Sequence, residues 1–191
     1  MISIGITGII GSGKSMLSQV FRTMGIPVYD ADTQAKVLMN SNLQIKNSLV
    51  KEFGEDTYIE GTINKDYLRK IVFGNEAKRQ IVNSIVHPAV KDDFIAWRQQ
   101  AGTEITAIES AILFEANIDD ILDHIIFVEA PEDVIIKRIC YRDKVTEEIA
   151  RQKIHIQRQN SGHEKCDTFF VNDRNHSLIE QTEKFINNLK I

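Results

Sequence analysis

The amino-acid sequence predicts an α/β fold in which a five-stranded parallel sheet is flanked by helices. Two observations lead to this prediction. Apolar stretches rich in β-branched residues alternate along the chain with helical segments, which is the pattern of consecutive βαβ units. A glycine-rich segment joins the first apolar stretch to the first helical one, as in α/β folds that bind phosphate at this turn. We therefore expect an α/β domain with its binding site near that turn.

Each predicted strand is a short apolar run without polar alternation, as expected of strands that are buried on both faces of a parallel sheet. These runs span residues 2–6, 26–29, 105–109, 125–128 and 168–171. Helical segments lie between and after them. The predicted helices span residues 14–24, 31–39, 131–141, 146–158 and 178–189.

Residues from about 42 to 100 interrupt the alternation. Their apolar residues have helical periodicity, and no convincing strand is found among them. A helical insertion between the second and third strands of the sheet explains this pattern best. Such an insertion is a natural place to bind a substrate, but composition alone equally allows a purely structural layer of helices.

Composition and charge exclude several classes of protein. Of the 191 residues, 42% are hydrophobic and 26% are charged, which is the balance of a globular domain. The net charge of -4 argues against broad binding to nucleic acid or to an anionic membrane. No signal-peptide pattern opens the chain, and no apolar run approaches the roughly 18 residues that span a bilayer. Cys140 and Cys166 lie far apart without a Cys-x-x-Cys pair, so we expect reduced thiols in a cytoplasmic protein.

The glycine-rich segment is a complete phosphate-binding motif. From Gly8 to Ser15 the chain reads Gly-Ile-Ile-Gly-Ser-Gly-Lys-Ser, which fits G-x-x-x-x-G-K-[ST] and lies between a predicted strand and a predicted helix. Glycines let the backbone turn its N–H groups toward phosphate, and the helix N-terminus adds partial positive charge. We expect Lys14 to contact the β- and γ-phosphates of ATP and the Ser15 hydroxyl to ligate Mg²⁺. The nucleotide-binding residues predicted from this motif are Gly8, Gly11, Ser12, Gly13, Lys14, Ser15 and Met16. This context indicates a P-loop NTPase fold.

Other motifs decide which class of P-loop protein fits. A GTPase needs an Asn-Lys-x-Asp motif after a late strand, and the similar string at residues 64–67 has the wrong spacing and lies in the insertion. The Leu-Ser-Gly-Gly-Gln signature of transporter ATPases is absent, and the chain is short for a motor or helicase core. Elimination leaves a kinase of small metabolites.

Carboxylates follow the second and third predicted strands. Asp30 and Asp32 come at the carboxyl end of the second strand, where open α/β sheets bind ligands. One of them can orient or deprotonate an acceptor hydroxyl while the other caps the next helix, and we favour Asp32 for the chemistry. Glu109 and Glu115 follow on the third strand and its loop. Either can hold an acceptor group or a magnesium-bound water, and a purely structural hydrogen-bonding role is equally open.

A basic group lies on or just after the helix predicted at 131–141. Arg138 and Arg142 are four residues apart and so share a helix face, with Lys137 beside them. Guanidinium groups placed in this way can neutralise charge that develops on a transferring phosphoryl group. The alternative is a solvated face paired with Glu132 or Asp143. Adenine recognition is expected near residues 172–175, whose spacing is too generic to assign a single residue.

Taken together, these motifs resemble the dephospho-coenzyme A kinase family over residues 2–173. The phosphate loop alone indicates a superfamily, whereas the added Asp-Ala-Asp, His-Pro and Leu-Phe-Glu sequences are more specific. The segments that carry the resemblance are Ile6-Thr7-Gly8-Ile9-Ile10-Gly11-Ser12-Gly13-Lys14-Ser15, Val28-Tyr29-Asp30-Ala31-Asp32 with Ala35, Leu68-Arg69-Lys70-Ile71-Val72-Phe73, Ile85-Val86-His87-Pro88, Leu113-Phe114-Glu115 and Lys137-Arg138 with Arg142-Asp143.

The resemblance implies an enzyme that uses ATP and Mg²⁺ to phosphorylate the ribose 3′-hydroxyl of dephospho-CoA, in the last step of coenzyme A synthesis. It also implies three parts. These are a nucleotide core of about 1–40 and 101–191, a helical acceptor-binding insertion of about 41–100, and a lid of about 137–160. The expected partner is the small-molecule substrate, without nucleic acid or membrane, and the expected state is a monomer or weak homo-oligomer.

Site residues follow from the resemblance by position. Asp32 matches the family's proposed catalytic base, Lys14 its phosphate lysine, and Arg138 and Arg142 its lid positions near ATP. His87, followed by Pro88, marks the helical part and is expected with Glu115 and Asp32 to bind the acceptor. A helix boundary at the His-Pro pair is the alternative for that position.

The sequence departs from the family pattern at two points. The usual Gly-Gly-Ile of the loop is Gly-Ile-Ile here, which places Ile9 at a position where the motif does not require glycine. The usual Pro-Leu-Leu-Phe-Glu has Ala111 in place of proline, so the local loop geometry is open. The nearest alternative function is a kinase of a nucleoside monophosphate or a sugar acid. A regulatory module that binds nucleotide and grips a protein partner is a more distant one.

Overall fold

The computed structural model describes residues 1–159 and 161–189 and forms two compact units. Unit 1 consists of Met1–Asp30 together with the chain from Ala101 onward, and unit 2 is Ala31–Gln100. Unit 2 is therefore one continuous insertion into the chain of unit 1. Among the described residues, no helix is long and apolar enough to cross a membrane.

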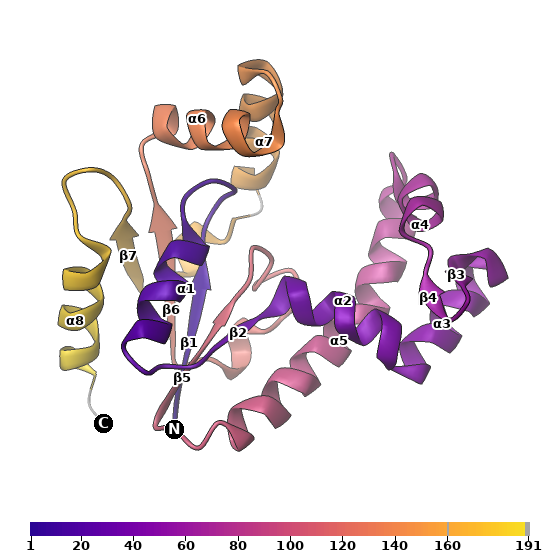
Figure 1. Ribbon diagram of the computed structural model, residues 1–191, viewed down its shortest axis with the longest axis horizontal. Helices are drawn as coiled ribbons and strands as arrows, with labels where there is room; N and C mark the ends of the chain where they lie inside the picture. The colour runs from indigo at the N-terminus through magenta and orange to yellow at the C-terminus, as the bar shows by residue number, and fades with distance from the viewer. Residues whose placement is uncertain (160, 190–191) are drawn as a thin grey trace. The chain divides into compact units, whose positions relative to one another are not determined.

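Unit 1 is built on a five-stranded sheet with the order β2-β5-β1-β6-β7, in which each neighbouring pair runs parallel (Figure 1). The strands are β1 (Ile2–Thr7), β2 (Val28–Asp30), β5 (Ile105–Glu109), β6 (His124–Glu129) and β7 (Thr168–Val171). Each overlaps one of the predicted strands, so the predicted α/β fold with five parallel strands is confirmed. Because β1 is central, the turn that follows it lies at the middle of the carboxyl edge, where ligands of open α/β sheets bind.

Helices cover the sheet and bury its apolar side chains. On one face α1 (Lys14–Thr23) and α8 (Leu178–Asn188) contact each other. The core that includes residues of β1, β6, β7, α1 and α8 consists of Ile4, Ile6, Leu17, Phe21, Ile26, Val28, Ile105, Ala107, Ile126, Val128, Phe170 and Leu178. Burying each such side chain stabilises the fold by about 1.5–3 kcal/mol.

A second apolar cluster involves α6 (Glu132–Asp143) and α7 (Glu147–Gln159), which are drawn in orange beyond the carboxyl ends of the strands in Figure 1. We call it the α6–α7 cluster. Its buried members are Ile9, Phe127, Ile135, Ile136, Ile139, Ala150 and Ile154. Cys140 and Cys166 pack against it as free thiols, and burial raises the pKa of the Cys166 thiol to about 12. At neutral pH Cys166 is therefore protonated, which suits a structural cysteine.

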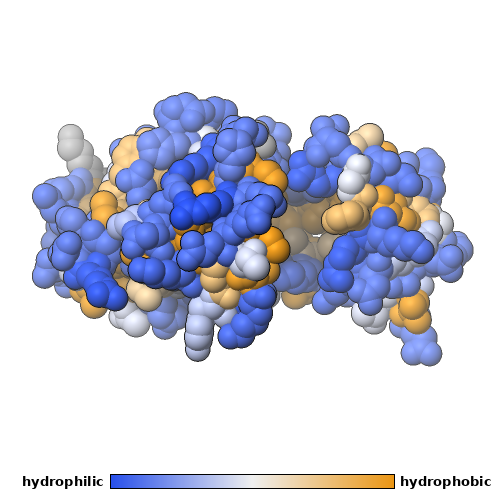
Figure 2. Space-filling model, turned by 90° about the horizontal axis from the view of Figure 1, so that it is seen from above, coloured by the Kyte–Doolittle hydropathy of each residue, from blue (hydrophilic) through white to orange (hydrophobic). Residues whose placement is uncertain are grey.

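Unit 2 is mainly helical, as the periodicity predicts. Its helices are α2 (Ala31–Ser41), α3 (Leu43–Phe53), α4 (Lys65–Val72) and α5 (Glu76–Gln100). Its buried apolar side chains include Ile45, Leu49, Ile63, Leu68, Val86, Val90 and Phe94. Figure 2 shows that hydrophilic residues dominate the surface of the face in view, with apolar side chains in patches among them.

Unit 2 also contains a short hairpin that the sequence analysis did not expect. β3 (Tyr58–Ile59) pairs antiparallel with β4 (Thr62–Ile63), and the turn residues Glu60 and Gly61 have φ of 48° and 81°. Positive φ at both positions is the mark of a type I′ turn, the favoured two-residue hairpin connection. Strands of two residues are too short to produce a periodicity, and glutamate is not a typical residue at the first turn position.

The alternative that the His87-Pro88 pair is a helix boundary is wrong. Pro88 lies inside α5, which runs unbroken from Glu76 to Gln100. Proline removes one backbone hydrogen bond from a helix but does not end it where tertiary packing holds both sides. Val86 and Val90, on either side of the proline, are both buried.

Candidate phosphate-binding site

The turn between β1 and α1 has a conformation that only glycine adopts easily. Gly8, Gly11 and Gly13 have φ of 143°, 79° and 104°. A side chain at Gly8 would bring its Cβ to 2.5 Å from the Val128 carbonyl oxygen, which is far inside contact distance. Backbone conformation therefore favours glycine at all three positions, of which Gly8 and Gly13 are the motif glycines, and the close approach of β6 also requires it at Gly8.

This turn leads directly into the N-terminus of α1. The first amides that donate within the helix are those of Met16 and Leu17, both to the Gly13 carbonyl at 3.0 and 3.1 Å. Ser15 precedes them, so its N–H belongs to the first turn, where helix amides have no intrahelical partner. Amides of this kind and the helix dipole together form an anion-binding site. Met16 itself is 57% exposed, and its N–H is bonded to the Gly13 carbonyl within the helix.

The Lys14 ammonium lies against the loop itself. Its Nζ donates to the carbonyl oxygens of Gly8 at 2.8 Å and Ile9 at 3.2 Å. The structure therefore places the cation of the motif at the same turn as the glycines. Ser12 is fully buried, and its Oγ has no hydrogen-bond partner among the described residues.

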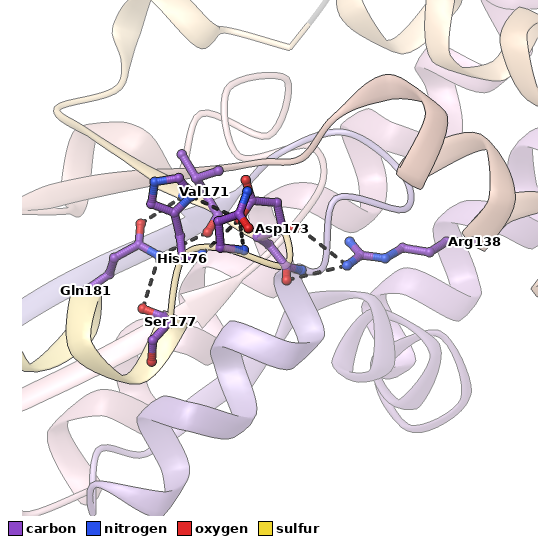
Figure 3. A network of polar contacts seen from close by, with 8 residues as sticks. Arg138, Val171, Asp173, His176, Ser177 and Gln181 are labelled. Carbon is purple, nitrogen blue, oxygen red and sulfur yellow. Dashed lines mark hydrogen bonds and ion pairs between the residues drawn. The ribbon is translucent and has the colours of Figure 1, made fainter.

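Arg138 reaches the phosphate loop from α6. Its Nη1 donates to the carbonyl oxygens of Gly11 and Ser12, both at 3.2 Å. Its Nη2 lies 3.4 Å from the backbone oxygen and 3.5 Å from Oδ1 of Asn172, and Figure 3 shows the guanidinium pointing toward the turn after β7. The structure thus brings Arg138 together with the motif residues.

Arg142 is not brought to the loop. It is 59% exposed, and its Nε donates to the Asp143 carboxylate at 2.7 Å. Lys153 of α7 donates to the same carboxylate at 2.8 Å. Hydrogen bonds from Arg142 and then Lys153 hold the pKa of the Asp143 carboxyl well below its usual range, and the same contact raises the pKa of Arg142. This agrees with the alternative of a surface pair with Asp143, and Lys137 likewise pairs with Asp133 at 3.6 Å.

A cleft of 580 Å³ lies beside Arg138, on the turn between β7 and α8. It is lined by Pro131, Asp133, Val134, Lys137, Arg138, Asp173, Arg174 and Asn175. Asp173 Oδ1 accepts hydrogen bonds from the backbone amides of Asn175 and His176, at 2.8 and 2.9 Å, and from His176 Nδ1 at 2.9 Å (Figure 3). The Asn175 amide first, and then the His176 side chain, lower the pKa of the Asp173 carboxyl. The Asp173 carboxylate therefore orders this turn through its hydrogen bonds. The turn contains the segment that is expected to recognise adenine.

The predicted carboxylates fall in different environments. In unit 1, Glu109 ends β5 half-buried, and its backbone pairs in register with Asp30, the last residue of β2. Glu115 is exposed in the following loop, where the Ser110 hydroxyl accepts from the Ile112 amide at 3.1 Å. That side-chain turn and buried Leu113 order the loop at the place where the family pattern has proline.

Asp32 and His87 belong to unit 2. α2 begins at Ala31, where the predicted helix also begins, so Asp32 lies within its first turn and Asp30 directly precedes the helix. The Asp32 side chain is exposed, whereas His87 is half-buried on α5. A carboxylate in the first turn of a helix is also favoured by the helix dipole.

Two contacts of the loop were missed by the sequence analysis. The Gln157 side chain on α7 accepts from the Ile10 amide at 2.6 Å, and the Asn172 side chain donates to the Ser12 carbonyl at 2.7 Å. Ile9, the departure from the family pattern, is buried in the α6–α7 cluster and leaves the motif glycines in place. Glutamine on a helix and asparagine after a strand are common, so only the fold identifies these two residues.

Ser15 is the residue of the loop suited to a divalent cation. Its hydroxyl is a hard oxygen ligand, which Mg²⁺ prefers, and it is exposed at the start of α1. The described residues contain no group of three or more His, Cys, Asp or Glu side chains that could hold a metal ion. Magnesium commonly keeps water and phosphate ligands and takes few from the protein, so the donor set fits a cation bound with a nucleotide.

The chain is similar to known proteins in both sequence and structure. The sequence model of the dephospho-CoA kinase family matches residues 2–178. Dephospho-CoA kinase of Porphyromonas gingivalis is 38% identical over 192 residues, covering 100% of this chain and 95% of that protein. The enzyme of the same name from Bacteroides fragilis is 36% identical over 189 residues, covering 97% and 91%.

Solved structures show the same fold. TT1252 from Thermus thermophilus has a TM-score of 0.82 at 23% identity and covers 97% of this chain and 96% of its own. Dephospho-CoA kinase from Campylobacter jejuni has a TM-score of 0.69 at 22% identity, covering 97% and 95%. Shikimate kinase from Acinetobacter baumannii has a TM-score of 0.57 at 14% identity, covering 100% and 96%. The fold is that of P-loop kinases, and by the extent of the sequence match the chain belongs to the dephospho-CoA kinase family.

Proposed function

We propose that this protein transfers the γ-phosphoryl group of ATP to the ribose 3′-hydroxyl of dephospho-CoA, giving coenzyme A and ADP. The observation that carries the proposal is the complete phosphate loop in a chain that matches the family from residue 2 to residue 178. A kinase of another small metabolite would share the loop, but no observation favours one. We further propose that the enzyme acts in the cytoplasm as a monomer or weak homo-oligomer.

The nucleotide is held by the phosphate loop in this proposal. Backbone amides of Gly11, Gly13 and Ser15 face the phosphates, and the Lys14 ammonium exchanges its contacts with the Gly8 and Ile9 carbonyls for phosphate oxygens. A cation that moves from neutral carbonyls to an anion gains the stronger, charge-assisted hydrogen bonds. Adenine occupies the cleft between Arg138 and the turn after β7.

Ser15 would hold Mg²⁺ through its hydroxyl, with the remaining ligands from phosphate and water. When bound, the cation neutralises charge on the phosphates. Side chains of the protein supply the remaining positive charge. Arg138 is placed at the loop carbonyls, and we propose that its guanidinium turns to the transferring group when nucleotide binds.

We propose that the acceptor side of the reaction depends on Asp32 as the base that orients and deprotonates the ribose hydroxyl. Support comes from its exposure in the first turn of α2 and from its match to the family's motif. His87 and Glu115 are proposed to contact the acceptor, and Arg142 to reach the phosphates when α6 and α7 act as a lid. Closure of such a lid excludes water that would otherwise hydrolyse ATP.

Acceptor-dependent release of ADP tests the proposal. The enzyme is incubated with Mg-ATP alone and then with dephospho-CoA, a nucleoside monophosphate panel or a sugar-acid panel. Stimulation by dephospho-CoA alone is the expected result. Stimulation by a different acceptor would replace the substrate and keep the kinase, whereas bound nucleotide without any stimulation would favour a regulatory module.

A further inference from the structure

Asn172 is a buried polar residue at the carboxyl end of β7. It is 5% exposed, and its backbone N–H donates to the Glu129 carbonyl at 2.7 Å, next to the register pair of Glu129 with Val171. The backbone of Asn172 is therefore fixed by the sheet. A buried side-chain amide costs free energy unless it is hydrogen-bonded, so its partners show what the side chain is used for.

The strongest of those partners is the phosphate loop. Asn172 Nδ2 donates to the Ser12 carbonyl oxygen at 2.7 Å, across 160 positions of sequence. Arg138 donates to the same oxygen at 3.2 Å, and its second nitrogen lies 3.5 Å from Asn172 Oδ1. The Ser12 carbonyl is thus held by two donors, of which the asparagine amide is the closer and the one anchored directly to the sheet.

Fixing that carbonyl also fixes the amide on the other side of the same peptide. No peptide bond of the described chain is cis, and in a trans peptide the C=O and the following N–H point in opposite directions. The Ser12 carbonyl points at Asn172, so the Gly13 N–H points to the opposite side of the loop. The Ser12 N–H already donates to the Ile9 carbonyl at 3.2 Å. The amide whose direction is set by the bond between Asn172 and the Ser12 carbonyl is therefore that of Gly13.

Steric contact reinforces the hydrogen bond. Gly13 has φ of 104°, and a Cβ built there would overlap the Asn172 side-chain amide. Glycine at position 13 therefore makes room for Asn172, in addition to allowing the backbone conformation. The Asn172 side chain therefore requires glycine at position 13, although only Gly13 is part of the phosphate-loop motif.

We propose that Asn172 is a positioning residue of the phosphate loop, which turns the Gly13 amide toward the nucleotide phosphates by holding the Ser12 carbonyl on the opposite side. The proposal rests on the proposed use of the loop to bind ATP. It does not depend on which acceptor is phosphorylated. Its consequence is that part of the phosphate affinity is set by the end of β7, outside the motif.

Binding of Mg-ADP without any acceptor tests the proposal, by calorimetry on the wild type, Asn172→Asp and Asn172→Ala. The Asp variant keeps the shape but turns an acceptor toward the Ser12 carbonyl, and the Ala variant removes the donor. Each should raise the Kd of Mg-ADP by about tenfold, the effect of losing a buried hydrogen bond and leaving its partner unpaired. Asn187→Asp, with the same charge change at an exposed position of α8, is the matched control and should bind as the wild type does.

Two further readouts separate positioning from a general loss of structure. In the wild type, the Gly13 amide proton and nitrogen resonances should shift on addition of Mg-ADP, and the shift should be smaller in both Asn172 variants. In turnover, KM for ATP should rise while KM for the acceptor stays constant. Partial unfolding would instead lower the apparent kcat and leave KM for ATP unchanged. If Asn172→Asp does not fold, Asn172→Ala, which adds no charge, carries the comparison.

Unchanged Mg-ADP affinity and an unchanged Gly13 shift in a folded Asn172 variant would overturn this inference alone. Failure of the wild type to bind Mg-ADP would overturn the proposed function, and the inference with it. Normal Mg-ADP binding with no activity on dephospho-CoA would contradict the proposed acceptor and leave the role of Asn172 supported. The three outcomes therefore distinguish the two proposals.

Discussion

Single residues of the phosphate loop are constrained by backbone conformation as well as by chemistry. Gly13 combines a φ of 104° with a neighbour, Asn172, that fills the space a side chain would need. Gly102 has a φ of 66° but has no heavy atom within 4 Å of a built Cβ. A comparison of Gly13 with Gly102 therefore separates two costs of adding a side chain. One is the strain of the left-handed backbone, and the other is the overlap with Asn172.

Gly13→Ala should lower the melting temperature more than Gly102→Ala does. Both changes place alanine in a left-handed conformation, at a cost of about 1–2 kcal/mol. Only the first also displaces Asn172, so it should weaken Mg-ADP binding while the Gly102 variant binds normally. Thermal unfolding and calorimetry on the two variants check this. Equal losses of melting temperature and of Mg-ADP affinity in both variants would show that the contact with Asn172 has no effect.

Lys14→Ala should raise the Kd of Mg-ADP by about ten- to a hundredfold, the effect of losing a hydrogen bond to a charged group, and should lower kcat as well. The fold should persist, because Lys14 belongs to neither of the two apolar clusters of unit 1. Isothermal calorimetry and steady-state kinetics measure the two effects. Lys184→Ala, an exposed lysine on α8, serves as the control. Wild-type binding and turnover in the Lys14 variant would undo the assignment of the loop.

Asp32→Asn should lower kcat by about 10²–10⁴, the range for loss of a general base, with KM for ATP nearly unchanged. The amide keeps the shape of the side chain but does not accept the proton of the acceptor hydroxyl. Asp66→Asn, at an exposed aspartate of α4, is the matched control. Turnover at the wild-type rate in the Asp32 variant would exclude this residue as the base.

At the scale of elements, α6 and α7 are joined by an ion-pair network around Asp143. Arg142 and Lys153 donate to its carboxylate at 2.7 and 2.8 Å. Glu132 similarly accepts from Arg151 and Arg158 of α7, at 3.0 and 2.7 Å. These contacts connect the two helices that carry the proposed lid.

Asp143→Asn should lower the melting temperature at neutral pH, and the difference from the wild type should shrink in acid. The folded-state pKa of Asp143 is lowered, first by the Arg142 hydrogen bond and then by Lys153. A lowered carboxyl pKa contributes stability above the unfolded value of about 3.9, and that contribution is lost as pH falls toward the folded value. Calorimetric melting from pH 7 to strongly acidic pH measures the difference, and a difference that does not depend on pH would contradict the pairing.

The regular elements of unit 1 could be predicted because their signals are local. The runs at 2–6 and 105–109 are apolar and β-branched, and the loop between the first strand and helix carries its own motif. The hairpin Tyr58–Ile63 could not be predicted, since two-residue strands carry no period. The start of α2 at Ala31 agrees with the helix predicted from residue 31, but the sequence did not decide whether Asp30 or Asp32 caps it, because aspartate is acceptable at either position.

The candidate site was predictable only where it is contiguous in sequence. Residues 8–15 could be identified from the motif, whereas Gln157 and Asn172 contact the loop across 147 and 160 positions. The shared-face argument placed Arg138 and Arg142 together and left pairing with Asp143 as the alternative, whereas in the structure Arg138 contacts the loop carbonyls and Arg142 pairs with Asp143. Which partner each arginine contacts depends on where the fold places the end of α6. The spacing of the residues in the sequence does not determine that position.

At the scale of the whole molecule, the chain consists of an α/β unit that carries the phosphate loop and an inserted helical unit. Sequence relatives such as dephospho-CoA kinase of Porphyromonas gingivalis match over 100% of the chain, so both units belong to the family pattern. The central claim is that this enzyme transfers the γ-phosphoryl group of ATP to one hydroxyl of dephospho-CoA.

The fate of the γ-phosphate tests this claim most directly. ATP labelled with ³²P in the γ-position is incubated with the enzyme, magnesium and dephospho-CoA, and the products are separated by chromatography. The account predicts that the label appears in coenzyme A, is removed by a 3′-nucleotidase and is absent when dephospho-CoA is omitted. Label found only in inorganic phosphate, or in a product that resists the 3′-nucleotidase, would contradict it.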